Sequence, residues 1–123
     1  MEIRDPRSPI PNGRPVDPAQ AEQVLNAALD SGINLFDTAE GYGNGASETD
    51  LGRALVGVPR DSYYIATKWQ HHDGKAESLK EDPAELELSV NDSLSRLRTD
   101  HIDVMQFHGL APQHYTEAVA RFY

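Results

Sequence analysis

The 123-residue sequence contains no cysteine, few aromatic residues and no long apolar run. The absence of cysteine excludes disulfide bonds and thiolate metal sites. No stretch approaches the roughly 20 apolar residues of a membrane-spanning helix, and the start lacks the basic and apolar regions of a signal peptide. We therefore expect a cytoplasmic protein without membrane contact. Basic residues are also scarce, and the net charge of −9 argues against nucleic acid as a partner.

Regular structure is missing from the start of the chain, where prolines are concentrated. Residues 1–17 carry four prolines and show no sustained apolar periodicity, so we predict an irregular Pro-rich N-terminal segment. Beyond this segment, helical and strand patterns alternate. The apolar content of the chain, 38%, is enough for one core. The predicted organisation is therefore the segment 1–17 followed by one domain over residues 18–123.

Three helices are predicted, each after a capping residue and each with an apolar face. The predicted ranges are 18–31 after Asp17, 48–56 after Ser47, and a third helix that begins at Pro83 after Asp82. The third has the clearest apolar face, formed by Leu86, Val90, Leu94 and Leu97. A further helix is expected within residues 114–123.

Three apolar runs are typical of buried strands, and each ends at an ionisable side chain. They run from Ile33 to Asp37, from Tyr63 to Lys68 and from Ile102 to His108. Alternation with helices predicts parallel strands joined by right-handed crossovers. The carboxyl ends of such strands lie at one face of the fold, where α/β proteins place their chemistry. We expect Asp37, Lys68 and His108 to converge there, together with Tyr42 in the glycine-flanked loop after Asp37.

Other ionisable residues have simpler interpretations. His71 and His72 are adjacent, so their side chains point in different directions, and we expect a solvated loop over residues 69–80 and no metal site. His101 and His114 belong to no motif and are expected at the surface. Asp103 is expected to be a buried, hydrogen-bonded structural acid.

The motifs together resemble the aldo/keto reductase family. The similar stretches are Gly32-Ile-Asn-Leu-Phe-Asp-Thr-Ala-Glu-Gly-Tyr-Gly43, Ser47-Glu48 with Leu51-Gly52, Ile65-Ala-Thr-Lys68, Ser93-Leu94 with Arg96-Leu97, Asp100-His-Ile-Asp103, and Gln106-Phe-His108. They cover most of the chain from Pro18 to His108. The resemblance implies an α/β fold, specifically part of a (β/α)8 TIM barrel, and an oxidoreductase that uses NADPH to reduce an aldehyde or ketone to an alcohol.

The resemblance also implies a catalytic tetrad of Asp37, Tyr42, Lys68 and His108. Tyr42 would protonate the developing alkoxide, which a phenol with an ordinary pKa of about 10 does poorly without a nearby cation. Lys68 would be that cation, and Asp37 would pair with it. His108 would position the carbonyl oxygen. The family aspartate also lies close to the nicotinamide ribose, so Asp37 is the predicted cofactor-binding residue.

The sequence departs from the family in length. A complete barrel takes about 250 residues, whereas about three of its strands are expected here. We therefore expect a fragment, a truncated paralogue, or a piece that assembles with another chain, with self-association through the incomplete barrel. Two alternative functions remain at this point, namely a non-catalytic binding or regulatory subunit on the same fold and a metal-dependent hydrolase on a related barrel.

Overall fold

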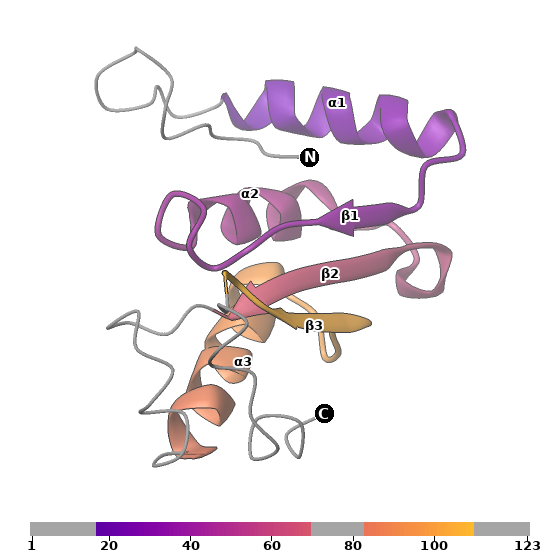
Figure 1. The fold of residues 1–123 in the computed structure, drawn as a ribbon. Coiled ribbons are helices and arrows are strands. Elements are labelled where there is room, and N and C mark those ends of the chain that lie inside the picture. Colours follow the sequence, from indigo (N-terminus) through magenta and orange to yellow (C-terminus); the bar gives the residue numbers. More distant parts are fainter. Residues whose placement is uncertain (1–16, 70–82, 110–123) are drawn as a thin grey trace.

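The computed structural model describes residues 17–69 and 83–109, which form a three-stranded sheet with helices packed against it (Figure 1). The elements follow the order α1 (Pro18–Asp30), β1 (Leu35–Asp37), α2 (Ala46–Ala54), a 3-10 turn η1 (Arg60–Ser62), β2 (Tyr64–Trp69), α3 (Pro83–Leu97) and β3 (Val104–Phe107). The strand order is β1-β2-β3, and both strand pairs are parallel. The predicted alternation of helices with parallel strands is confirmed.

The sheet has a covered face and an open face, because successive side chains of a strand point to opposite sides. In β2, Ile65 and Thr67 are fully buried beneath the helices. Tyr64 and Lys68 point to the other face, where Tyr64 is 54% exposed. Leu35 pairs with Tyr64 in the register and is 56% exposed. The described helices therefore leave one face of the sheet open.

The core lies between the covered face and all three helices. Its buried members come from α1, from α2 and the residue after it, from the start of β2 and the residue before it, and from α3, and are Leu25, Leu51, Leu55, Tyr63, Ile65 and Leu97. Fully burying one such side chain stabilises the fold by about 1.5–3 kcal/mol. The predicted inward direction of Leu51 and Leu55 is confirmed, and of the four residues predicted on the apolar face of α3, Leu97 is fully buried and the others partly.

Of the capping residues predicted for the first two helices, one is confirmed and one is wrong. Asp17 caps α1 as predicted, since its carboxylate accepts a hydrogen bond from the backbone N–H of Ala19 at 3.1 Å. The cap predicted at Ser47 is wrong, because α2 begins at Ala46 after Gly45, which has a φ of +83°. The Ser47 hydroxyl instead accepts a hydrogen bond from Thr38 at 2.9 Å inside the protein. A buried partner just after β1 thus takes the serine hydroxyl that was expected to cap the helix.

The strand β2 runs one residue beyond its predicted end. Trp69, predicted to open a loop, pairs with Phe107 of β3 and is 3% exposed. Leu86 of α3 and Met105 and Phe107 of β3 pack around it. The indole therefore forms a second small core at the carboxyl end of the sheet. Residues 70–80 of the predicted loop, the predicted cap Asp82 and the helix expected within 114–123 lie outside the described residues.

Asp103 lies at the amino end of the sheet, just before β3, and is hydrogen-bonded as predicted. Its carboxylate accepts bonds from the Arg60 guanidinium and from the backbone N–H of Ile65, the latter at 2.8 Å. Its side chain is 20% exposed, so it is less buried than expected. This ion pair joins η1 to the start of β2 and β3.

Two further predictions concern the division of the chain into regions and the absence of a membrane span. The Pro-rich segment 1–17 lies almost wholly outside the described residues, so the division into two regions stays a prediction. Among the helices that the structure describes, none is long and apolar enough to cross a membrane.

Candidate active site

The carboxyl ends of the three strands bring together the side chains that the sequence singled out. The Lys68 ammonium donates hydrogen bonds to both carboxylate oxygens of Asp37, at 2.8 and 2.7 Å, and to the backbone carbonyl of Thr38 at 2.9 Å. The register of β1 and β2 fixes this pair. Asp37 pairs with Ala66, and Lys68, two residues after Ala66 in β2, points to the same face of the sheet as Ala66. The Lys68 side chain is 14% exposed and that of Asp37 is 44% exposed. The pair thus has one sheltered member and one that still contacts solvent.

Tyr42 and His108 lie beside this pair. The Lys68 ammonium is 5.3 Å from the centre of the Tyr42 ring, within the range of a cation–π contact. The rings of Tyr42 and His108 meet edge to face, with centroids 5.4 Å apart and planes at 90°. The backbone N–H of His108 donates to the carbonyl of Trp69 at 2.8 Å, which continues the β2–β3 ladder to the histidine. The four predicted residues therefore form one cluster.

The Tyr42 loop, residues 38–45, is held by backbone hydrogen bonds to β2 and within itself. The N–H of Thr38 donates to the carbonyl of Ala66 at 2.8 Å, and the N–H of Glu40 donates to that of Lys68 at 3.3 Å. Left-handed backbone at Gly43, Asn44 and Gly45 then turns the chain into α2. The loop lies next to the strand that carries Lys68, which explains how Tyr42 reaches the cluster.

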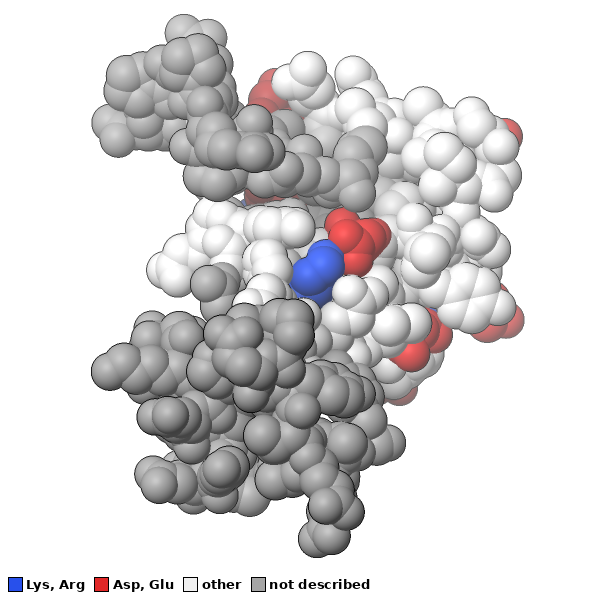
Figure 2. All heavy atoms as spheres, in the orientation of Figure 1, with Lys and Arg blue, Asp and Glu red and all other residues white. Residues whose placement is uncertain are grey.

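The described surface carries little free positive charge near this cluster. Figure 2 shows basic and acidic side chains in contact on the face turned to the viewer, with mostly uncharged surface around them. Of the five basic residues in the described ranges, four form ion pairs with carboxylates, namely Arg53 with Asp50, Arg60 with Asp103, Lys68 with Asp37 and Arg96 with Glu48. Among these paired basic residues, Lys68 is the one that belongs to the cluster.

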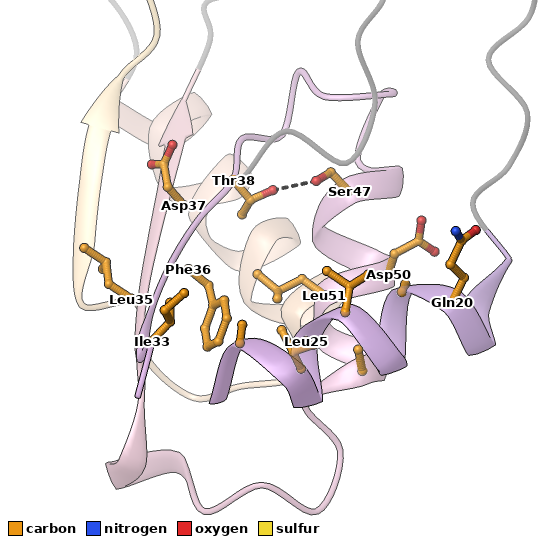
Figure 3. A pocket seen from close by; sticks show the side chains of 14 residues that line it. Gln20, Leu25, Ile33, Leu35, Phe36, Asp37, Thr38, Ser47, Asp50 and Leu51 are labelled. Carbon is orange, nitrogen blue, oxygen red and sulfur yellow. Dashed lines mark hydrogen bonds between the residues drawn. The ribbon is translucent and has the colours of Figure 1, made fainter. Parts of the chain in front are cut away.

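An apolar pocket of about 430 Å³ lies on the other side of β1, between α1 and α2 (Figure 3). Leu25, Phe36 and Leu51 line it together with Asp37, whereas Tyr42, Lys68 and His108 do not. Figure 3 shows the Asp37 carboxylate directed away from these apolar side chains. The pocket thus adjoins the ionisable cluster at Asp37 and does not include its other three members.

Shifted pKa values lie at the opposite, amino end of the strands. Burial raises the pKa of Asp103, but the hydrogen bond from the Ile65 N–H and the Arg60 guanidinium outweigh it, so the pKa lies below its ordinary value. Burial raises the pKa of Tyr63, against the opposing effect of Arg60. Within residues 17–69 and 83–109, no group of three or more His, Asp or Glu side chains is placed to hold a metal ion. These facts leave the Asp37–Lys68–Tyr42–His108 cluster as the candidate site.

The comparison with known proteins identifies the family. The model of the aldo/keto reductase family matches residues 9–122. The chain belongs to the aldo/keto reductase family. As in other members of this oxidoreductase family, the chain is built on the (β/α)8 barrel, of which the three parallel strands and their helices form a part, and the predicted fold class is confirmed.

Curated and solved aldo/keto reductases resemble the chain over most of its length. It is 38% identical to the aldo-keto reductase YhdN of Bacillus subtilis, over 70% of the chain and 27% of that protein. It is 39% identical to a 6-dehydroglucose reductase of Novosphingobium aromaticivorans, over 79% of the chain and 33% of that protein. A Klebsiella pneumoniae aldo-keto reductase in complex with NADPH superposes with a TM-score of 0.65 at 30% identity, over 85% of the chain and 35% of that protein. The chain thus spans about a third of the length of these relatives.

Sequence reasoning missed several polar residues that support the cluster. Glu48 opens the predicted helix 48–56 and was given no role of its own, yet its side chain is fully buried and hydrogen-bonded to Thr67 and Arg96. The spacing held a clue, because Glu48 lies on the same helix face as Leu51 and Leu55. Arg96 likewise follows Ser89 and Ser93 on one stripe of α3, and both serines are buried.

Proposed function

We propose that this chain supplies the proton-transfer site of an aldo/keto reductase that reduces an aldehyde or ketone to an alcohol with NADPH. The observation that supports it best is the position of the Lys68 ammonium, paired with Asp37 on one side and 5.3 Å from the Tyr42 ring on the other. A purely structural lysine at a strand end has no need of a phenol and an imidazole beside it. The cluster fits general acid catalysis.

Each residue has a separate role in this proposal. The Tyr42 hydroxyl donates a proton to the oxygen of the carbonyl group. The Lys68 ammonium stabilises the phenolate that remains, and Asp37 holds the ammonium in place. His108 donates a hydrogen bond that orients the carbonyl oxygen. Its Nδ1 atom is buried and has no hydrogen-bond partner among the described residues, which fits a ring that is held by packing against Tyr42.

The cofactor proposal rests on relatives and on the chemistry of Asp37. The Klebsiella pneumoniae relative was solved with NADPH. Bound NADPH supplies the hydride that the carbonyl carbon receives. In this proposal Asp37 accepts a hydrogen bond from a ribose hydroxyl, a role that its carboxylate and its 44% exposed side chain support.

The substitution Tyr42→Phe tests the proposal. Carbonyl reduction is monitored through the loss of NADPH absorbance. It is measured for the chain itself and for a complete barrel, in which residues 9–122 replace the matching part of the Bacillus subtilis relative. We expect Tyr42→Phe in the complete barrel to lower kcat by roughly 10²-fold or more while NADPH binding stays close to normal.

Tyr64→Phe is the matched control. Tyr64 lies on the same open face of the sheet, near its amino end and away from the cluster, and is 54% exposed. Its substitution is expected to leave the rate unchanged. Carbonyl reduction at an undiminished rate by the Tyr42→Phe barrel contradicts the assignment of Tyr42 as the proton donor.

A further inference from the structure

A buried acid lies directly behind the candidate active site. The Glu48 side chain is fully buried, and its two oxygens bind groups from two different elements. The Thr67 hydroxyl of β2 donates to one oxygen at 2.6 Å, and the Arg96 Nε of α3 donates to the other at 2.6 Å. A buried carboxylate is costly without such partners, so breaking either contact leaves an uncompensated polar group. Glu48 therefore fixes the start of α2 against both β2 and α3.

The contacts of Glu48 and Arg96, together called the Glu48–Arg96 pair, reach two parts of the candidate site. Thr67 immediately precedes Lys68, so its hydrogen bond anchors β2 at the point where Lys68 projects from the opposite face. Arg96 also forms an ion pair with Glu40 at 3.8 Å, and the Ser89 hydroxyl donates to the same Glu40 oxygen. Glu40 lies in the Tyr42 loop, two residues before Tyr42. The Glu48–Arg96 pair thus contacts the supports of both Tyr42 and Lys68.

Two glycines make room for Arg96 at this junction. A Cβ atom at Gly45 would lie 2.7 Å from the Cδ of Arg96, and one at Gly52 would lie 2.5 Å from the Arg96 backbone carbonyl oxygen. Gly45 is the last residue of the Tyr42 loop. The arginine therefore packs directly on the end of the loop, in a space that any larger side chain would fill.

We propose that Glu48 and Arg96 are positioning residues that hold the Tyr42 loop against the strand carrying Lys68. An apolar pair of similar volume would join α2 to α3 as well as this ion pair does, but it would bind neither Thr67 nor Glu40. The charged pair is suited to fix the separation between the phenol and the ammonium. The role in catalysis rests on the proposed function, whereas the role in holding the loop does not.

Hydrogen exchange measured by mass spectrometry on the full chain tests the loop-holding role without NADPH or substrate. Glu48→Gln keeps the side-chain volume and an acceptor for Thr67 but removes the charge that binds Arg96. Amides of the Tyr42 loop are expected to exchange about tenfold faster or more, while amides of residues 60–66 at the amino end keep their rates. Arg96→Lys, which retains the charge but lacks the planar fork, is expected to give an intermediate rate.

Arg60→Gln is the matched control, because it breaks the ion pair with Asp103 at the other end of the sheet. When the variants are compared at the same free energy of unfolding, Arg60→Gln is expected to speed amide exchange at residues 60–66. The exchange rates of the Tyr42 loop are expected to stay unchanged. Uniform acceleration of both regions by Glu48→Gln, or by Arg96→Lys if the first variant does not fold, overturns the proposal.

The complete barrel described above tests the role in catalysis. There, Glu48→Gln is expected to lower kcat by roughly 10²-fold with KM within about a factor of two, because the reacting groups lose alignment while the ligand contacts remain. An effect on KM alone overturns the catalytic role. If no variant of the barrel, nor the unsubstituted one, reduces a carbonyl, the proposed function fails, and the exchange result still decides whether the pair holds the loop.

Discussion

Both carboxylate oxygens of Asp37 accept hydrogen bonds from the Lys68 ammonium, at 2.8 and 2.7 Å. The two residues are 31 positions apart in sequence, and the parallel register of β1 and β2 brings them together on the open face of the sheet. The ammonium is much more sheltered than the carboxylate. A sheltered cation with an accessible acid beside it can act on a neighbouring group, here the Tyr42 phenol, while its charge stays compensated.

Asp37→Asn is expected to destabilise the chain by about 1–2 kcal/mol, because the sheltered Lys68 ammonium loses its charged partner and keeps only the Thr38 carbonyl and one amide oxygen. Denaturant titration measures the difference. Asp100→Asn is the control, since Asp100 is 91% exposed and its contact with His101 lies at the surface, and we expect no measurable change. Equal stability of Asp37→Asn and the unsubstituted chain would mean that the ion pair contributes nothing to the fold.

The Asp103 carboxyl makes stability depend on pH. Its pKa is lowered in the folded chain, so its contribution is fully present above the unfolded pKa, about 3.9, and is lost as pH falls through the lower folded value. Asp103→Asn is expected to cost about 1 kcal/mol at neutral pH, mainly through the lost ion pair with Arg60. Denaturant titrations from pH 7 to about pH 3 should show the gap closing only at the acid end. A gap that stays constant to the lowest pH would contradict the lowered pKa.

The purified 123-residue chain is expected to self-associate and to bind NADPH weakly. Leu35, Tyr64 and Val104 are 56, 54 and 43% exposed on β1, β2 and β3. Exposed apolar side chains on a sheet whose outer strands have no further partner strand among the described residues favour association. Most basic side chains of the described ranges are already paired, which leaves little to hold an anionic dinucleotide against a net charge of −9.

Size-exclusion chromatography with light scattering, and calorimetric titration with NADPH, check this prediction. Adding charge with Leu35→Glu and Val104→Glu should reduce the association. Val56→Glu is the matched control, because Val56 is 64% exposed but follows α2, away from the open face of the sheet, and it should have no effect. A compact monomer with micromolar affinity for NADPH would refute the expectation.

The convergence of the four ionisable residues could be predicted because it depends on topology alone. Three apolar runs that each end at a polar side chain, separated by helices, place those ends at one edge of a parallel sheet. Asp37, Lys68 and His108 are found there, and Tyr42 follows in its loop. No side-chain geometry was needed for this prediction, only the period of the strands and the sense of the crossovers.

The supporting residues could not be predicted in the same way, because their roles depend on tertiary partners. Glu48 has the local pattern of a helix-start acid, and Arg96 that of a cation at a helix end, so each has a sufficient explanation within its own helix. Only the packing of α2 on α3 shows that they bind each other. Ser47 and Trp69 were misplaced for the same reason, since a buried hydroxyl and a strand partner outweighed the local pattern.

A double-mutant cycle on Tyr42 and Lys68 tests most directly whether the two residues act as one site. In the complete barrel, kcat/KM is measured for Tyr42→Phe, Lys68→Met and the double variant. If Lys68 acts through the phenol, the double variant is expected to be about as active as Tyr42→Phe alone, because removing the ammonium has no further effect once the phenol is gone. Losses that multiply, so that the double variant is slower than Tyr42→Phe by the full factor of Lys68→Met, would contradict a shared proton-transfer site.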